Sequence, residues 1–426
     1  VKVDTTLPTV SSVAITGAAG VQNSFVNAGD NVSVTATFSE VVNVDNSSGN
    51  NPTITLVVGT DDNRTAVYAS GDNSTELVFR YTIQAGENDS NGIHIPADAL
   101  DNNSSIIKDA VDNINTDLTH SQWLFNYAYI VDTTPPTVSS VAITSAPSSS
   151  APSSLGLQNS FLNADDRVKE TVTFNEVFPS AVIVSGNPTL TLVVGSTHRT
   201  AVYDSDNNST PPSVNDNATL VFEYTIKANG TSGENDDDGI SIVGNALNVA
   251  SRSLMDRAGN IATDLTHSAV DNNSSYKVDT TPPSVDNFTI SDTLLTIGET
   301  MAVTLEFSEA VCADSSVCGS NVFSWNGSSG DMTVPNLDNN TPSGTLSTMT
   351  SDDNRTWEGT FTPATNAEDD NNTLSLATTY TDLAGNNGPA ETTANYEVDT
   401  LAPTVSSVAI TGAAGVQNSF VNVGDN

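Results

Sequence analysis

Residues 5–31 read TTLPTVSSVAITGAAGVQNSFVNAGDN, and residues 400–426 repeat this stretch almost unchanged. The two copies differ at only three positions, which are Thr6/Leu401, Leu7/Ala402 and Ala28/Val423. Weaker copies of the first half begin at Val131 (VDTTPPTVSSVAIT) and at Val278 (VDTTPPSVDNFTI). Self-similarity of this kind is typical of a tandem array, in which each repeat is one structural unit.

The phrase Val-Asp-Thr marks the seams between repeats, and a chain of 426 residues is expected to hold about three domains. The seam aspartates are Asp4, Asp132, Asp279 and Asp399. They predict repeat 1 at residues 1–131, repeat 2 at 132–278, repeat 3 at 279–398 and the incomplete start of a fourth at 399–426. Repeats 1 and 2 share one subtype and repeat 3 has another. The last segment supplies one strand and a turn, which is too little for a sandwich of its own.

Alternating apolar and polar residues predict strands throughout the chain. In NVSVTATFSE (residues 31–40) the apolar residues Val32, Val34, Ala36 and Phe38 alternate with Ser and Thr, which is the pattern of a half-buried strand. Further strands are predicted at 52–58, 65–69, 76–84, 125–131, 188–194, 200–203, 219–227 and 276–278. About seven short strands per repeat indicate an all-β fold of tandem immunoglobulin-like β-sandwich domains, arranged as an elongated array.

One residue breaks the pattern of the second strand. In repeat 2, Val168, Val172 and Phe174 keep the alternation, but Glu170 falls on the inward face. A charged group there requires either a β-bulge, which would turn it outward, or a buried ion pair. The sequence leaves these two alternatives open.

The chain is strongly acidic, with 12 basic and 51 acidic residues and a net charge of −39. Such a charge repels nucleic acid and anionic membranes, so neither is an expected partner. It suits a chain that must stay soluble or one that collects cations. No signal peptide and no apolar run of membrane-spanning length is evident. The two cysteines, Cys312 and Cys318, are expected to form a local disulfide, with a metal site or free thiols as alternatives.

Three acidic positions recur in each repeat. They are the seam Asp, a Glu that closes the second strand, and an Asp that opens a tight loop before the last strand. Threading an immunoglobulin-like sandwich brings all three to the N-terminal pole of the repeat. The residues are Asp4, Glu40 and Asp109 in repeat 1, Asp132, Glu176 and Asp256 in repeat 2, and Asp279, Glu309 and Asp382 in repeat 3, followed by Asp399 at the last seam.

The loop after the fifth strand is acidic as well, and it lies at the opposite pole, facing the next repeat. Its candidate residues are Glu87, Asp89, Asp236, Asp237, Asp369 and Asp370. Clustered carboxylates repel one another, and Ca²⁺ removes this repulsion by taking six to eight oxygen ligands. The expectation is therefore several Ca²⁺ ions at the seams, with Asn260 and Asn386 as further oxygen donors. The alternative is that these acids only cap solvated turns.

The phrases VDTTxPTVSSVAIT, FSE, TLxVG…RTAVY and D-x-AGN resemble those of bacterial immunoglobulin-like repeats in giant extracellular surface proteins, including the extender repeats of RTX-type adhesins. The resemblance covers essentially the whole chain. It implies a secreted, cell-surface rod, stiffened by Ca²⁺, that holds a binding domain away from the cell. The loop DAVDN of repeat 1 departs from the pattern, because Asp112 replaces the glycine.

An enzyme is not expected. His120 and His267 occupy the same repeat position, beside Ser121 and Ser268, but no third catalytic partner accompanies them. The leading hypothesis is a structural extender whose partners are neighbouring repeats of the same chain. A second is a self-assembling filament, in which residues 400–426 complete a domain of another copy. A third, a carbohydrate- or protein-binding module, has little support because Trp123, Trp325 and Trp357 are scattered.

Overall fold

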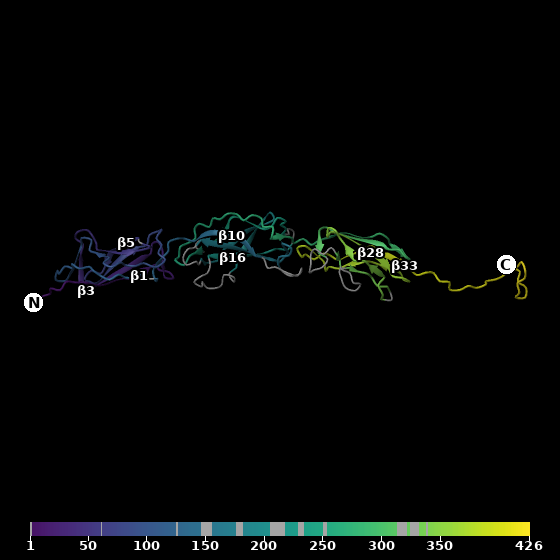
Figure 1. Cartoon of the computed structure of the whole chain (residues 1–426), viewed down its shortest axis with the longest axis horizontal. Coiled ribbons are helices and arrows are strands. Elements are labelled where there is room, and N and C mark those ends of the chain that lie inside the picture. Colours follow the sequence, from purple (N-terminus) through teal and green to yellow (C-terminus); the bar gives the residue numbers. More distant parts are fainter. Residues whose placement is uncertain are drawn as a thin grey trace. The chain divides into compact units, whose positions relative to one another are not determined.

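The computed structural model describes residues 2–60, 62–124, 127–145, 156–175, 182–204, 218–228, 234–249, 254–312, 322–323, 332–337 and 340–426. Within these ranges the chain is built of strands and turns and has no helix (Figure 1). None of the described segments is therefore a helix with the length and apolarity to cross a membrane.

The chain separates into two compact units, and each large sheet lies within one of them. The first unit is Val1–Ala146, Arg167–Ile226 and Asp236–Lys277, and the second is Pro147–Asp166, Lys227–Asn235 and Val278–Asn426. Each large sheet takes its strands from one predicted repeat. The predicted repeat boundaries and the elongated arrangement stay predictions.

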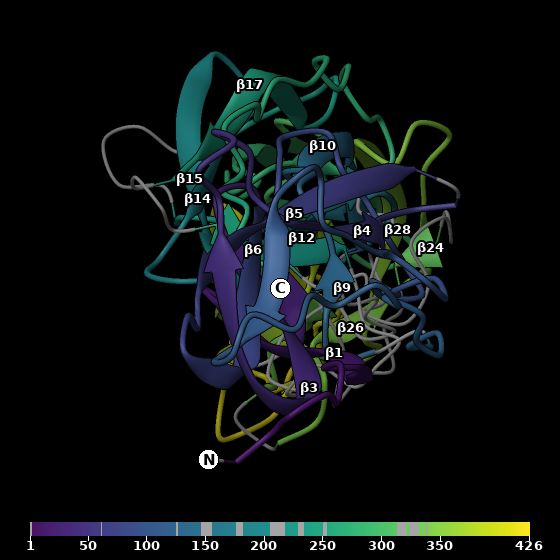
Figure 2. The same ribbon diagram turned by 90° about the vertical axis from the view of Figure 1, so that its left-hand side faces the viewer.

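Repeat 1 forms an antiparallel sheet of order β1-β3-β6-β5-β4-β7, with β8 also paired to β3 and β2 paired in parallel with β9. In Figure 2, β1, β3 and β6 lie side by side. The strands are β1 (Val10–Ala19), β2 (Phe25–Val26), β3 (Asn31–Asp45), β4 (Thr53–Val57), β5 (Asn63–Ser70), β6 (Ser74–Thr82), β7 (Leu100–Asp101), β8 (Ile106–Asp109) and β9 (Ile130–Val131).

Repeat 2 repeats this arrangement, with the sheet order β10-β12-β16-β15-β14-β17. Its strands are β10 (Thr137–Ser145), β11 (Phe161–Leu162), β12 (Arg167–Asn175), β13 (Ile183–Val184), β14 (Thr189–Val194), β15 (Thr197–Tyr203), β16 (Thr219–Thr225), β17 (Ser241–Asn248), β18 (Leu254–Met255) and β19 (Lys277–Val278).

Repeat 3 has a different set of strands around a sheet of order β20-β22-β28-β27-β24. They are β20 (Val285–Ile290), β21 (Leu294–Thr296), β22 (Met301–Phe307), β23 (Val311–Cys312), β24 (Val322–Phe323), β25 (Met332–Thr333), β26 (Gly344–Leu346), β27 (Met349–Thr350), β28 (Thr356–Pro363), β29 (Glu368–Asn372), β30 (Ser375–Leu376), β31 (Thr381–Asp382), β32 (Glu391–Thr392) and β33 (Tyr396–Asp399).

The alternating apolar residues fill the cores, as predicted. On β3, Val32, Val34, Ala36 and Phe38 are all buried. The same alternation is buried on β22, where Trp357 of the neighbouring β28 is also enclosed. Because each sandwich buries one face of every long strand, the polar face is left to water. The all-β, immunoglobulin-like class expected from the sequence is therefore the observed one.

Glu170 is buried on β12 and faces the core. The pairing of β12 with β16 runs through Glu170 without a register shift. The side chain is 0% exposed, and neither carboxylate oxygen has a hydrogen-bond partner. The pairing with β10 does shift register next to Glu170, between Ile143 and Ser145, but this irregularity leaves Glu170 facing the core. The expected ion pair is wrong, because no partner reaches the carboxylate.

Candidate metal centre

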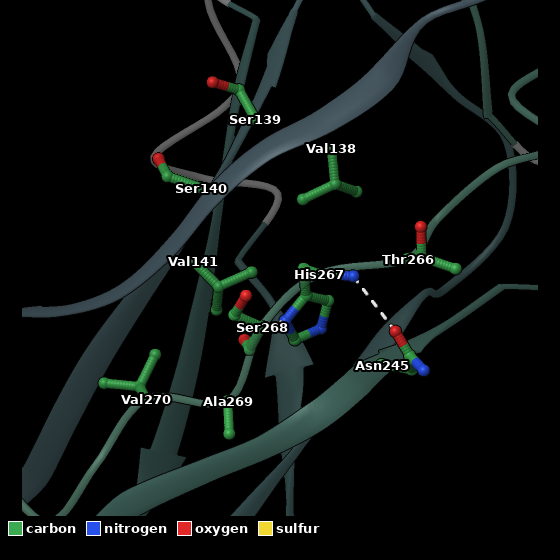
Figure 3. A pocket seen from close by; sticks show the side chains of 10 residues that line it. All are labelled: Val138, Ser139, Ser140, Val141, Asn245, Thr266, His267, Ser268, Ala269 and Val270. Carbon is green, nitrogen blue, oxygen red and sulfur yellow. Dashed lines mark hydrogen bonds between the residues drawn. The ribbon is translucent and has the colours of Figure 1, made fainter.

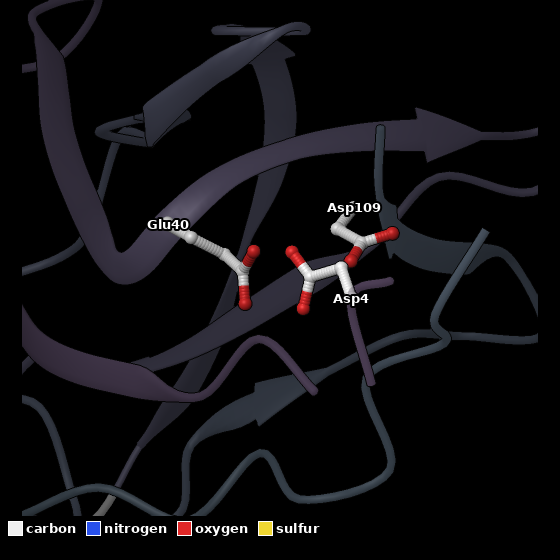
Figure 4. Close-up of side chains that lie close together, drawn as sticks. All are labelled: Asp4, Glu40 and Asp109. Carbon is white, nitrogen blue, oxygen red and sulfur yellow. The ribbon is translucent and has the colours of Figure 1, made fainter. Parts of the chain in front are cut away.

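Three carboxylates converge at one pole of repeat 1, as the threading predicted. Asp4 precedes β1, Glu40 lies within β3 and Asp109 ends β8. One oxygen from each of these side chains lies within 4.8 Å of the others (Figure 4). Asp4 is exposed, Glu40 is half-buried and Asp109 is buried. Partial burial, with Asp4 and Asp109 nearby, raises the pKa of Glu40.

Repeat 3 brings the same three positions together in a more buried setting. Asp279, Glu309 and Asp382 also place one oxygen each within 4.8 Å of the others. Burial first, and then the charges of Asp279 and Asp382, raise the pKa of Glu309 to about 7. Burial also raises the pKa of Asp382 to about 6, against the hydrogen bonds from Asn386. Carboxylates held this close resist being charged together, which is the condition that a bound cation relieves.

Repeat 2 shows two of its three expected members. Asp132 is buried, and its Oδ2 has no hydrogen-bond partner. Burial raises the pKa of Asp132 to about 6, and the nearby charge of Asp256 adds to the shift. Burial also raises the pKa of Asp256. The third member, Glu176, lies outside the described residues, so its place in the cluster stays a prediction.

A five-residue loop holds each cluster in place through an asparagine. In repeat 2, Asn260 Nδ2 donates to Asp256 Oδ2 at 2.7 Å and to the seam carbonyl of Asp132 at 2.9 Å. The equivalent contacts of Asn386 measure 2.8 Å to Asp382 and 2.9 Å to Asp279. The role expected for these asparagines was oxygen donation to a metal, and the donor role of their amides was missed.

Repeat 1 has the same contact despite its altered loop. Asn113 Nδ2 lies 2.7 Å from Asp109 Oδ2 and 3.3 Å from the carbonyl of Asp4. Burial raises the pKa of Asp109, but the hydrogen bonds from Asn113 and Val111 outweigh it and lower the pKa overall. The shared spacing Asp-x-x-x-Asn was the signal for this residue.

The acids of the opposite pole do not join these clusters. Asp89 is buried and accepts from the backbone N–H of Gly59 at 2.9 Å and of Gly92 at 3.0 Å. Asp236 makes the same two contacts with Gly195 and Gly239, at 2.7 and 2.8 Å. Backbone donors thus hold these two carboxylates in place, and the metal role expected for them stays a prediction.

The remaining candidates of that pole are also placed as turn residues or exposed acids. Glu87 is buried and accepts from Arg64, from Tyr81 Oη at 2.5 Å and from the N–H of Gln84 at 2.8 Å. Asp369 caps the N–H of Asn371, and Asp237 and Asp370 are exposed. Asp399, the aspartate of the last seam, is exposed as well. No cluster of three metal-binding side chains found within the described ranges includes any of them.

Cys312 and His267 lie in structural contacts of the described chain. Cys312 is buried and disulfide-bonded. Cys318 lies outside the described residues, so the predicted pairing stays a prediction. His267 lines a hollow of about 570 Å³ with Ser268 and Asn245, and its backbone N–H donates to Asn245 Oδ1 at 3.0 Å (Figure 3). Its Nε2 accepts the N–H of Ala246 at 2.8 Å, so that nitrogen is not available as a base for Ser268.

The tryptophans offer no binding platform among the described residues. Trp357 is 0% exposed and Trp123 is half-buried against the core of repeat 1. Trp325 lies outside the described residues. Ligand-binding sandwiches usually present exposed aromatic residues, and the described pair does not.

One family model of known proteins matches part of repeat 3. Residues 326–398 match the family model of the bacterial Ig-like domain. This match covers part of repeat 3 and supports a bacterial Ig-like fold. No curated protein matches the chain.

Solved structures resemble the chain weakly. The Escherichia coli adhesin FdeC is 11% identical, with a TM-score of 0.29, over 91% of this chain and 96% of its own. The S-layer protein rSbsC(31–844) is also 11% identical, with a TM-score of 0.21, over 94% of this chain and 55% of its own. Scores this low carry no argument about function.

Proposed function

We propose that this chain is an extender segment of a bacterial surface protein, in which Ca²⁺ binds at the N-terminal pole of the repeats and stiffens the seams. One observation carries the proposal. Repeats 1 and 3 have different strand sets, yet both gather a seam Asp, a second-strand Glu and a loop Asp. A feature that persists while the surrounding strands change points to a shared task.

The residues fit a hard divalent cation. All three side chains of each cluster offer oxygen, the ligand atom that Ca²⁺ takes, and backbone carbonyls and water can fill the remaining positions. Asp132 Oδ2 is buried without a hydrogen-bond partner, as an oxygen reserved for a metal would be. When bound, the ion would supply positive charge that offsets the repulsion among the carboxylates.

The position of the clusters explains why binding would stiffen the chain. Each contains the seam Asp, which belongs to the linker, together with a Glu and an Asp from the body of the repeat. An ion held by all three would fix the linker to the repeat that follows it. The acidic charge of −39 would draw cations to these sites and keep the chain soluble.

Calcium titration calorimetry on the whole chain tests the proposal. We expect saturable binding that loses one site in the double variant Glu309→Gln/Asp382→Asn. The matched control is Glu397→Gln, which removes an exposed acid of the same repeat and is expected to keep every site. Absence of binding heat in the unmodified chain would assign the acids to turn capping alone.

Exposed apolar residues at 405–423 favour a second candidate, a self-assembling filament. Val408 and Ile410 are 91% and 95% exposed, whereas the matching Val13 and Ile15 of repeat 1 are 4% and 6% exposed. In repeat 1 the matching residues form β1, and in the filament a sheet of a second copy of the chain would pair with residues 405–413 in the same way. In this case sedimentation would reveal polymers that grow with concentration and disappear when residues 400–426 are deleted. A monomer at all concentrations would exclude this candidate.

A further inference from the structure

The turn formed by Gln-Asn-Ser-Phe occurs three times with one geometry. In residues 22–25, Gln22 and Phe25 exchange backbone hydrogen bonds of 2.8 and 2.7 Å. The copies at 158–161 and 417–420 make the same exchange, at 2.8 and 2.6 Å and at 3.1 and 2.9 Å. Each copy holds its Asn and Ser at positive φ, between 47° and 71°. The third copy keeps this shape although residues 401–413 have no strand pairing, so the turn is a local unit.

Two asparagines, one within this turn and one two residues after it, donate hydrogen bonds to the loop of the following repeat. In the first unit, Asn23 Nδ2 donates to the carbonyl of Arg257 at 3.1 Å, and Asn27 Nδ2 donates to that of Ala258 at 2.8 Å. These carbonyls belong to the loop Asp-x-Ala-Gly-Asn at residues 256–260. Two donors of one turn thus meet two consecutive acceptors of one loop.

The second unit repeats this contact with other residues. Asn159 Nδ2 donates to the carbonyl of Leu383 and Asn163 Nδ2 to that of Ala384, both at 2.9 Å. The loop at 382–386 again reads Asp-x-Ala-Gly-Asn. The recognised groups are backbone carbonyls, so the identity of the second loop residue is free. The loop glycine lies close to the turn, because a Cβ on Gly259 would stand 2.6 Å from Gln22 Nε2.

Repeat 3 lacks this pair of donors at its own far pole. The parallel pairing of Val26 with Val131 corresponds to that of Leu295 with Val398, which places Asp292 and Thr296 where repeat 1 has Asn23 and Asn27. The Asp292 carboxylate accepts from the N–H of Leu294, and the Thr296 hydroxyl donates to Glu299 at 2.8 Å. Neither contact leaves a donor for a following loop.

We propose that the Gln-Asn-Ser-Phe-x-Asn turn is an interdomain clasp, whose partner is the Asp-x-Ala-Gly-Asn loop of the next repeat. The clasp holds two successive repeats together without any cation. Seams that have a clasp are therefore rigid, and a seam without one is not held in this way. Residues 417–422 are then a preformed docking site for such a loop. This inference rests on the proposed function in that it takes the repeats to act in series.

Distance measurement between two spin labels, in chelator, tests the clasp apart from calcium. Labels at Val67→Cys and Val202→Cys report on repeats 1 and 2 from exposed strand positions. The test variant is Asn23→Asp/Asn27→Asp, because Asp is close in size and tolerates positive φ but donates no hydrogen bond. We expect a narrow distance distribution in the unmodified chain. In the variant the equilibrium constant for docking should fall about fivefold for each lost bond, which broadens the distribution.

The third copy of the turn supplies a matched control. Asn418→Asp/Asn422→Asp makes the same changes in the same phrase and is expected to leave the distribution narrow. Asn27→Leu is a second test variant that adds no charge, and circular dichroism checks that each variant folds. An unchanged distribution in both test variants would overturn the clasp, whatever calcium does. Broadening in chelator together with an absence of calcium binding would support the clasp and reject the calcium proposal.

Discussion

At one core position of repeat 2, a carboxyl group takes the place of valine. The alternation on the second strand aligns Glu170 with Val34 of repeat 1 and Val303 of repeat 3, and all three are 0% exposed. Glu170 pairs across β12 with Ile143 on one side and Phe222 on the other. Burial, with a smaller contribution from the charge of Glu223, raises its pKa well above the ordinary value. Burial therefore favours the neutral form of this carboxyl group.

Replacing this residue by Glu170→Val should stabilise repeat 2. The change removes a buried polar group that has no hydrogen-bond partner and restores the side chain that the other repeats use. We expect a gain of about 1–3 kcal/mol in the free energy of unfolding. Hydrogen exchange of the β12 and β16 amides measures it, since these strands flank the site. If the protection of those amides did not change, the buried carboxyl group would cost no stability in the folded repeat.

The raised pKa of Glu170 also makes the stability of repeat 2 depend on pH. The folded-state pKa of Glu170 is raised, so its carboxyl group binds more protons in the folded than in the unfolded chain. Its contribution to stability is complete below the unfolded pKa and is lost as pH rises towards the folded one. Unfolding monitored by hydrogen exchange should therefore become easier with rising pH in this window. Glu170→Gln removes the ionisation but keeps the polarity, and it should flatten this dependence.

At the scale of elements, the Asp-x-x-x-Asn loop joins the carboxylate cluster to the linker. The Asn amide bridges the loop Asp and the seam carbonyl in all three repeats, including the altered loop of repeat 1. In repeats 2 and 3, neighbouring carbonyls of this loop accept the hydrogen bonds from the clasp asparagines of the preceding repeat. One short element thus contacts the candidate metal centre, the linker and the preceding repeat.

Removal of this bridge by Asn386→Ala should destabilise repeat 3. The change leaves the half-buried Asp279 carbonyl and the buried Asp382 without that donor, a loss of about 1–3 kcal/mol. Differential scanning calorimetry of the whole chain measures it. Asn395→Ala serves as the control because it removes a similar 2.9 Å bond to the Asp370 carbonyl from an exposed position. If both variants lowered the unfolding free energy equally, the Asn386 bridge would contribute no more to stability than an exposed hydrogen bond.

Strands in which apolar and polar residues alternate could be predicted from the sequence. Short strands whose pairing depends on tertiary contacts could not. The second strands of the repeats and their buried faces follow from a period of two, which the sandwich satisfies. The short strands β7, β8 and β13 carry too few residues to show a period. The seam carboxylates could be located by threading, because strand direction fixes which ends share a pole. The capping roles of Asp89 and Asp236 depend on backbone N–H groups of distant turns, which spacing does not reveal.

For the whole molecule, the net charge of −39 raises the question of whether cations act at sites or only by screening. Screening depends on ionic strength and falls off over about 10 Å at 0.1 M salt, irrespective of which cation is present. Binding at the clusters depends on calcium itself and on three named oxygens in each repeat. The two effects therefore separate when calcium is compared with sodium at equal ionic strength.

Scanning calorimetry of the whole chain under these two conditions makes the last prediction. We expect calcium to raise the unfolding temperature of repeat 3 more than sodium does, because an ion that binds only the folded state adds its binding free energy to stability. In Glu309→Gln/Asp382→Asn the difference between the two salts should vanish for repeat 3 and persist for repeat 1, whose cluster is intact. If the unfolding temperature of repeat 3 in the variant still differed between calcium and sodium, the effect would come from the dispersed surface charge. The clusters would then not be calcium-binding sites.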